Sequence, residues 1–288
     1  MVKTGSEARR LYSQHLRGCF PSRPEAEVDA VSALASAAVT VVGAGAATPA
    51  LVAGLASSGI GKIRLLGDAP VQSTHVQHSR FLRRADVSKP MSDALRARAL
   101  PPGYEGELDA TAALPETKID LQRELRGASF VVAVVTGPIL FPPWMDVLNE
   151  ATQDAGIPWT SAAVLEGTEL HVGPTIVPGK TACYKCFELR FKSNIPSIEP
   201  YLRFEAFIRE TGESRDFGLL PPLADIAGGL AAAETISALH PHRAPRTLGK
   251  LLTFHANSYS IDEHPVLRLP RCPSCTPVMN GPARREWS

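Results

Sequence analysis

Four of the five cysteines in this 288-residue chain stand in two pairs with identical spacing. Cys183-Tyr-Lys-Cys186 and Cys272-Pro-Ser-Cys275 each place two thiols three positions apart. Two such C-x-x-C pairs can supply four thiolates to one tetrahedral zinc ion. The segment between the pairs is far longer than the roughly 15–20 residues of a compact zinc ribbon, so a shared metal would tie the end of the chain to its middle. Because four thiolates leave no position open for water, we expect a structural site.

Two other interpretations of these cysteines stay open. The four thiols could simply be buried, or one pair could be redox-active, although neither explains why two pairs are present. The fifth cysteine, Cys19, lies beside Phe20 with no base nearby in the sequence, which indicates an ordinary free thiol. Since no cysteine lies between Cys19 and Cys183, we do not expect transfer of a substrate through a thioester.

The second candidate site is the turn Gly43-Ala-Gly45. It stands inside a strand, turn, helix, strand pattern that predicts a βαβ unit with parallel strands; the predicted elements are a strand over 38–42, a helix over 49–58 and a strand over 62–66. In such a unit the turn brings backbone N–H groups and a helix N-terminus towards a phosphate. Thr48 occupies the third glycine position of the fingerprint, so a turn that only packs helix on strand is the alternative.

The rest of the chain continues the α/β alternation and predicts a Rossmann-like, mostly parallel sheet. We expect one domain over residues 37–288, preceded by a short helical N-terminal arm over 1–36. The helix over 223–239 is rich in small residues and must approach its neighbour closely. The other predicted elements are a helix over 141–155 and strands over 130–135, 158–163, 169–172, 251–254 and 266–269.

Composition excludes some classes of partner. With 30 basic and 29 acidic residues, a net charge of +1 and no basic tract, nothing favours a nucleic-acid partner. Residues 30–61 carry no charge, but Gly43, Gly45, Thr48 and Pro49 interrupt them, so we expect no membrane span. The N-terminus has Glu7 where a signal peptide would be apolar, and we therefore expect a cytoplasmic protein.

Four segments together resemble the ThiF/MoeB superfamily, which is related to ubiquitin-activating enzymes. They are GAGAATPALVAGLASSGIGKIRLLGD, RFLRRADVSKP, GPTIVPGKTACYKC and HPVLRLPRCPSC. The third and fourth are most similar to the ocin-ThiF-like cyclodehydratase partner proteins of thiazole/oxazole-modified peptide biosynthesis. The resemblance implies a homodimer and identifies Cys183, Cys186, Cys272 and Cys275 with the family's structural zinc ligands.

The resemblance also implies where an ATP site would lie, and several of its residues differ here. Adenylating members have acids after the second strand, where this chain has Gly67, Asp68 and Ala69. The family's arginine and lysine fall at His78 and Met91, with Arg80 and Lys89 nearby, and no carboxylate follows the middle strand at 134–137. Because adenylation needs a carboxylate for magnesium and cations for the phosphates, these differences indicate a fold that no longer activates a carboxylate.

Two functional hypotheses follow from the resemblance. The first is a non-catalytic or weakly catalytic partner in the biosynthesis of a ribosomal peptide natural product, which supports a separate YcaO-type cyclodehydratase, the enzyme that uses ATP to form azolines, on a precursor peptide; the leader of that peptide could be bound by this chain or by another protein. The second is an ATP-dependent adenylating enzyme, with Mg·ATP held by Gly43, Gly45, Asp68, Arg80 and Lys89. An NAD(P) oxidoreductase is disfavoured, because Gly67 stands where an acid would bind the ribose.

Overall fold

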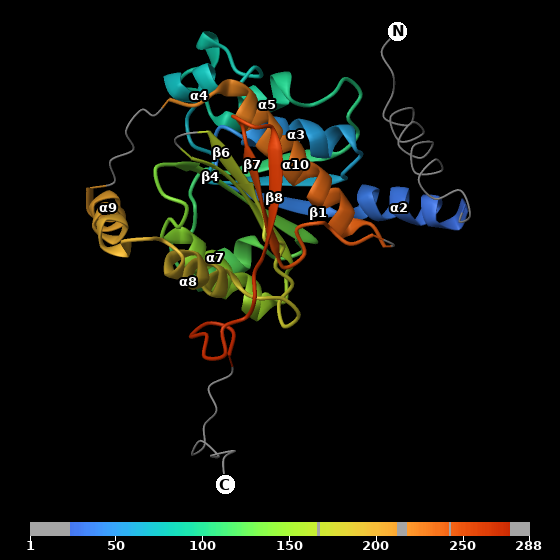
Figure 1. The fold of residues 1–288 in the computed structure, drawn as a ribbon. Helices are drawn as coiled ribbons and strands as arrows, with labels where there is room; N and C mark the ends of the chain where they lie inside the picture. The colour runs from blue at the N-terminus through green and yellow to red at the C-terminus, as the bar shows by residue number, and fades with distance from the viewer. Residues whose placement is uncertain (1–23, 166–167, 212–217, 242, 277–288) are drawn as a thin grey trace.

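The computed structural model describes residues 24–165, 168–211, 218–241 and 243–276, and describes side chains from Ala30 onward (Figure 1). In this part of the chain, eight strands form one sheet in the order β3-β2-β1-β4-β5-β6-β7-β8. The strands are β1 (Ala38–Val42), β2 (Lys62–Leu66), β3 (Glu107–Thr111), β4 (Phe130–Gly137), β5 (Trp159–Leu165), β6 (Glu169–Val172), β7 (Lys250–His255) and β8 (Ser260–Pro265). The pairings from β3 to β5 are parallel, whereas those from β5 to β8 are antiparallel. The predicted α/β class with a mostly parallel sheet is confirmed.

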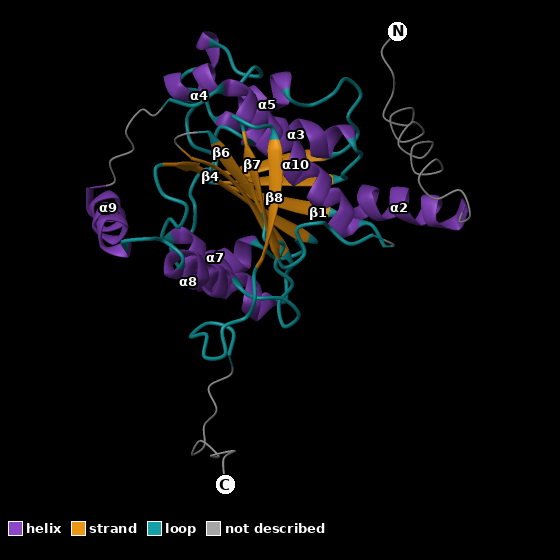
Figure 2. Ribbon diagram, in the orientation of Figure 1, coloured by secondary structure: helices purple, strands orange, loops and turns teal. Residues whose placement is uncertain are grey.

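Helices cover both faces of the sheet, as Figure 2 shows. Helices α3 and α10 lie on one face, and α7 and α8 lie on the other (Figure 1). The helices are α2 (Pro24–Ser36), α3 (Thr48–Ser57), α4 (Ser73–His78), α5 (Met91–Arg98), α6 (Lys118–Glu124), α7 (Trp144–Ala155), α8 (Tyr184–Ser193), α9 (Ile198–Thr211) and α10 (Pro221–Leu239), with a short 3-10 turn η1 at Arg84–Asp86. None of these helices is long and apolar enough to cross a lipid bilayer.

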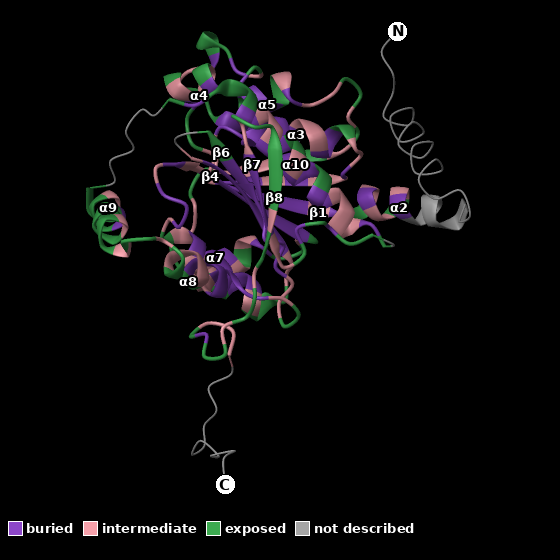
Figure 3. Ribbon diagram, in the orientation of Figure 1, coloured by how far each residue is buried: buried purple, intermediate pink, exposed green. Residues whose placement is uncertain are grey.

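The core follows the alternation of side chains along buried strands. Val39 and Val41 of β1 join the cluster under α3 and α10, whereas Val42 joins the cluster under α6, α7 and α8. Figure 3 shows the sheet interior almost wholly buried. The small residues of α10 permit the close approach that the sequence predicted, since a Cβ on Gly228 would lie 2.5 Å from the carbonyl oxygen of Ala47 in the turn before α3.

The predicted bounds of β1, β2 and β6 agree with the structure, and the strand predicted over 266–269 is wrong. The last strand, β8, ends at Pro265, and the apolar residues after it form a loop that leaves the sheet. The edge strand β8 is polar and largely exposed. It therefore lacks the apolar run that predicts a buried strand. Helix α2 accounts for residues 24–36 of the predicted helical arm, and residues 1–23 of that arm lie outside the described residues.

Candidate functional site

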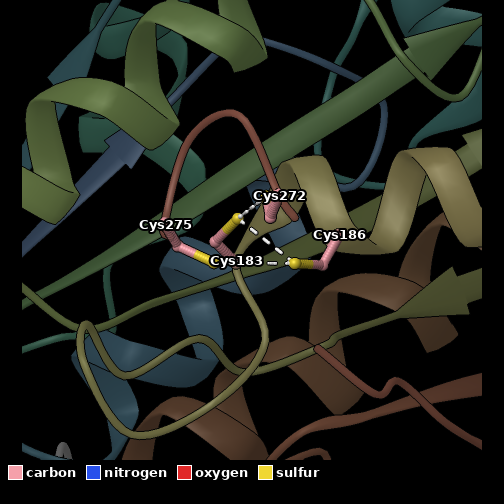
Figure 4. A group of neighbouring side chains, drawn as sticks. All are labelled: Cys183, Cys186, Cys272 and Cys275. Atoms are coloured by element: carbon pink, nitrogen blue, oxygen red, sulfur yellow. Dashed lines mark hydrogen bonds between the residues drawn. The ribbon is translucent and has the colours of Figure 1, made fainter. Parts of the chain in front are cut away.

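The two C-x-x-C pairs converge on one cluster, which Figure 4 shows. Sγ–Sγ distances are 3.8 Å for Cys183–Cys186 and 3.6 Å for both Cys183–Cys272 and Cys186–Cys275. All four sulfurs lie within 4.8 Å of one another. A tetrahedral zinc with Zn–S bonds of about 2.3 Å implies sulfur separations of about 3.8 Å. The donor set and its spacing therefore fit zinc.

Local structure positions each pair. Cys183 is the N-cap of α8 and Cys186 lies in its first turn, while the second pair stands on the loop after β8. Three groups hold that loop in place: Arg190 donates to the carbonyl oxygens of Leu267 and Arg268, Arg268 donates to that of Thr181, and Asn149 donates to the Ser274 hydroxyl. The loop is thus fixed on α7 and α8 independently of any metal.

Two of the thiols, those of Cys183 and Cys275, are in an environment that opposes their ionisation. Burial raises the pKa of Cys183 well above its usual range, and it raises that of Cys275 to about 11. A zinc ion reverses this effect, because a coordinating thiol is deprotonated by the metal's charge. Three of the four residues are buried, so the site is closed to solvent and suits a structural role.

A cavity of about 570 Å³ lies where β1 and β4 end side by side. The chain leaves β1 towards one edge of the sheet and leaves β4 towards the other, so the cavity stands at the topological switch point, where α/β sheets bind ligands. Its walls come from the glycine turn, α4, the end of β4, the start of α7 and the end of α9. Gly43 and Gly45 are both in its lining.

Both glycines of the turn are required by close packing. Gly43 has a φ of +97°, and a Cβ there would lie 2.6 Å from the carbonyl oxygen of Val134. A Cβ on Gly45 would lie 2.4 Å from Thr136 Oγ1. That hydroxyl accepts a hydrogen bond from the Ala46 amide at 3.0 Å, and Thr48 Oγ1 donates to the Gly43 carbonyl at 3.0 Å. The Ala46 amide and the Gly43 carbonyl of the turn are therefore hydrogen-bonded within the protein.

Other donors in the turn are available to a ligand. Among the described residues, the amides of Ala44 and Gly45 have no hydrogen-bond partner. The side chains nearby are Thr136, Thr74 and Gln72, with His75 and His78 from α4. Burial and the neighbouring His78 lower the pKa of His75, so His75 is neutral near pH 7.

The charges around the cavity do not suit magnesium. No Asp or Glu is among the described residues that line it, and Arg209 from α9 is its one Lys or Arg side chain. Magnesium is bound in proteins chiefly through carboxylates and substrate phosphates. The cavity can instead receive an anion without a metal, next to an apolar wall; the wall includes Leu114, Ile139, Trp144 and Ile208.

The three remaining candidate nucleotide residues do not line the cavity, and two of them have other partners. Asp68 accepts hydrogen bonds from the Ser92 amide at 2.8 Å and hydroxyl at 2.6 Å, at the start of α5. Arg80 forms an ion pair with Asp225 of α10 at 3.0 Å, with 73% of its side chain exposed. Lys89 is exposed, and its backbone bonds to Val71 and Asp86.

The C-terminal histidines do not form a second metal site in the described part of the chain, where only the cysteine cluster meets the geometry. His255 lies between Glu169 and Asp262, at 3.0 Å and 3.1 Å. His242 lies outside the described residues.

Comparison with known proteins agrees with this fold. The model of the ThiF family matches residues 22–275, and the chain belongs to that family. The chain is 27% identical over 154 residues to the sulfur carrier protein ThiS adenylyltransferase of Bacillus subtilis. The aligned segment covers 53% of this chain but only 44% of that relative.

Solved structures share the fold at low identity. The E. coli MccB structure superposes with a TM-score of 0.73 at 22% identity, covering 89% of this chain and 70% of MccB. The complex of the microcin C7 biosynthetic enzyme MccB with N-formylated MccA gives a TM-score of 0.71 at 22% identity, covering 87% and 70%. PaaA gives 0.69 at 16% identity, covering 84% and 76%.

Sequence reasoning missed Arg209 and Thr136 as cavity residues. Arg209 lies in α9, a helix the sequence did not predict because residues 194–220 lack a strong apolar period. In the sequence, Thr136 is marked only by the absence of a carboxylate at 134–137. Its place opposite Gly45 could have been found from the pairing of β1 with β4.

Proposed function

We propose that this chain is a non-catalytic, zinc-containing ThiF-like partner in the biosynthesis of a ribosomal peptide natural product. It supports a separate YcaO-type cyclodehydratase, which supplies the ATP chemistry that converts Cys, Ser or Thr side chains into azolines. The observation that carries the proposal is the cavity at the switch point, because its described lining has one arginine and no carboxylate.

The chemistry of adenylation is the physical reason. Transfer of an adenylyl group needs a metal held by carboxylate ligands and several cations around the phosphates. Here Asp68 caps α5 and Arg80 pairs with Asp225, so these side chains would have to give up existing bonds to serve a nucleotide. A partner protein needs the fold and can function without this machinery.

The solved MccB structures support a partner that binds within this fold. MccB has been solved with ATP and with MccA. By analogy, we propose that a precursor peptide occupies the corresponding region of this chain. We further propose a homodimer in the cytoplasm, with residues 37–288 forming the ThiF-like domain and 1–36 forming an arm.

The zinc centre has a structural role in this proposal. Zinc bound to Cys183, Cys186, Cys272 and Cys275 would supply a rigid, closed joint between α8 and the loop after β8. The side chains around it, from Asn149 to Arg268, hold the same loop through hydrogen bonds. Neither group of contacts includes the cavity, so zinc acts on stability and not on ligand chemistry.

The second candidate function is an adenylating enzyme acting on a peptide or protein carboxylate. The unpartnered amides of Ala44 and Gly45 favour it, because they stand at the N-terminal side of α3 where a phosphate could bind. In that case Asp68, Arg80 and Lys89 would have to move towards Gly43 and Gly45 on binding Mg·ATP.

Reconstitution of peptide modification separates the two functions. Purified chain, precursor peptide and YcaO-type enzyme are mixed with Mg·ATP, and loss of water from the peptide is followed by mass spectrometry. We expect water loss only when all are present, with ADP or AMP formed by the YcaO enzyme alone at a lower rate. AMP transfer to the peptide by this chain without the YcaO enzyme would contradict the proposal.

A further inference from the structure

Among the described residues that line the switch-point cavity, Arg209 is the one lysine or arginine, and it comes from α9, a helix outside the Rossmann-like sheet. We propose that Arg209 binds a singly charged carboxylate in this cavity, and that a chain of ion pairs through Glu205 and Lys192 positions its guanidinium. The inference rests on the proposed function in one respect, that the cavity takes an anionic group of a peptide without magnesium.

The guanidinium is fixed on one side and open on the other. Arg209 Nη2 donates to the Phe141 carbonyl oxygen at 3.1 Å and to Glu205 Oε1 at 3.2 Å. A guanidinium has five N–H donors in a planar fork. The N–H groups on Nε and Nη1 have no partner among the described residues, and 31% of the side chain is exposed. Arg209 can therefore offer donors to a planar carboxylate.

Buried charges hold Glu205 in place behind the arginine. Glu205 is 4% exposed, and Lys192 Nζ lies 2.7 Å from both Glu205 Oε2 and Glu188 Oε1. Lys185 continues the chain at 2.6 Å from Glu188 and 3.0 Å from Asp146. The six alternating charges are Arg209, Glu205, Lys192, Glu188, Lys185 and Asp146. Their formal sum is zero, and removing one buried member would leave an uncompensated charge.

The hydrogen-bond donors of the cavity select the ligand class. One arginine and no described carboxylate line it. Because Glu205 already offsets the charge of this arginine, the cavity offers a small anion the free N–H groups on Nε and Nη1 and no excess of positive charge. Mg·ATP carries more than one negative charge and would lack both its metal ligand and its further cations. The apolar wall that includes Ile139, Trp144 and Ile208 suits a hydrocarbon side chain next to the anion. A carboxylate attached to an apolar residue meets both requirements.

The first test compares two probes that differ in one charge. Binding of the acetylated tripeptide Ac-Ala-Ala-Leu and of its C-terminal amide is measured by NMR titration, following the side-chain Nε–H signal of Arg209. We expect the acid to bind and to shift this signal, and the amide to bind at least tenfold more weakly. Mg·ATP is titrated in parallel on the same full-length, zinc-loaded protein.

Variants assign the effect to Arg209. Arg209→Gln should remove the preference for acid over amide, and Arg209→Lys should retain a weaker one because lysine keeps the charge and loses the fork. Arg203→Gln is the matched control, since Arg203 is exposed on the same helix and does not line the cavity. A preference within twofold of the unmodified protein in Arg209→Gln, or no binding of the acid at all, would overturn the assignment.

The positioning role has its own readout. Lys192→Gln leaves Arg209 as the one described cation bonded to Glu205, so Glu205 competes more strongly with the ligand for the guanidinium, and we expect the acid-over-amide preference to fall several-fold. Lys192→Arg keeps a cation and should restore most of it. A purely structural role for Lys192 would lower the melting temperature and leave the ratio of the two affinities unchanged, which would overturn the positioning claim.

The parallel titration keeps the two proposals apart. If Mg·ATP binds tightly and Arg209→Gln weakens it, the non-catalytic function fails while Arg209 remains the anion-binding residue. If Mg·ATP binds tightly and Arg209→Gln has no effect on either ligand, both proposals fail. If the acid binds through Arg209 and Mg·ATP does not bind, both are supported.

Discussion

Replacing Cys272 by serine should release zinc and destabilise the chain by several kcal/mol. The metal would join Cys183 to a position 89 residues away. Closing a loop of that length lowers the entropy of the unfolded chain by the equivalent of about 4–5 kcal/mol. Urea unfolding followed by circular dichroism, with zinc measured in the same samples, gives the free energy of unfolding and the metal content together.

Two controls separate the metal from the hydrogen bonds around it. Chelation should destabilise the unmodified protein by a similar amount and leave Cys272→Ser unchanged, because that variant has already lost the metal. Ser274→Ala removes only the hydrogen bond from Asn149, so it should cost about 1 kcal/mol and retain zinc. A Cys272→Ser protein that keeps one zinc per chain, or a chelated protein of undiminished stability, would refute the reasoning.

Three further predictions concern the cavity and the core. Gly45→Ala should lower the free energy of unfolding by about 1–3 kcal/mol, because its Cβ would lie 2.4 Å from Thr136 Oγ1. Thermal unfolding measures the loss. Adding Thr136→Ala should recover part of the lost stability, and no recovery in the double variant would contradict the clash. Asp68→Ala should lower the free energy of unfolding by about 1 kcal/mol, because it removes the two hydrogen bonds from Ser92 at the start of α5. It should leave calorimetric titrations with Mg·ATP unchanged. A selective loss of Mg·ATP affinity would support the adenylating alternative instead. Burial lowers the pKa of His171 to about 4 from 6.5. The stability that neutral His171 contributes is therefore complete above pH 6.5 and is lost as pH falls towards 4, by up to about 3 kcal/mol. His171→Asn should make the free energy of unfolding less dependent on pH across that window, and an unchanged pH dependence would contradict the assignment.

The parts of the fold that the sequence predicted are those with a short-range signal. The β-branched run at Ala38–Val42 and the two cysteine pairs rest on residue type and spacing, and the structure contains the expected strand and a single cysteine cluster. The turn at Gly43 follows β1 as expected and lines the cavity, and its role in binding stays a prediction. Burial of both sheet faces makes these strands continuous apolar runs, which are easy to locate.

The parts that sequence reasoning missed depend on long-range contacts. Strand β8 is a polar edge strand and is stabilised by its pairing with β7, so no apolar pattern marks it. Arg209 reaches the cavity from α9, whose Glu205 is held by an ion pair to Lys192 of α8, a contact that no local pattern encodes. Asp68 and Arg80 illustrate the reverse case, in which proximity to a family motif in sequence does not place a side chain in the cavity.

Calorimetric titration of Mg·ATP into the full-length, zinc-loaded protein tests most directly whether the cavity has lost its nucleotide. A lining with one arginine and no described carboxylate predicts no measurable heat of binding at millimolar nucleotide. Saturable binding with a micromolar Kd, accompanied by exchange of pyrophosphate into ATP when a peptide carboxylate is added, would contradict it and would make this chain an adenylating enzyme.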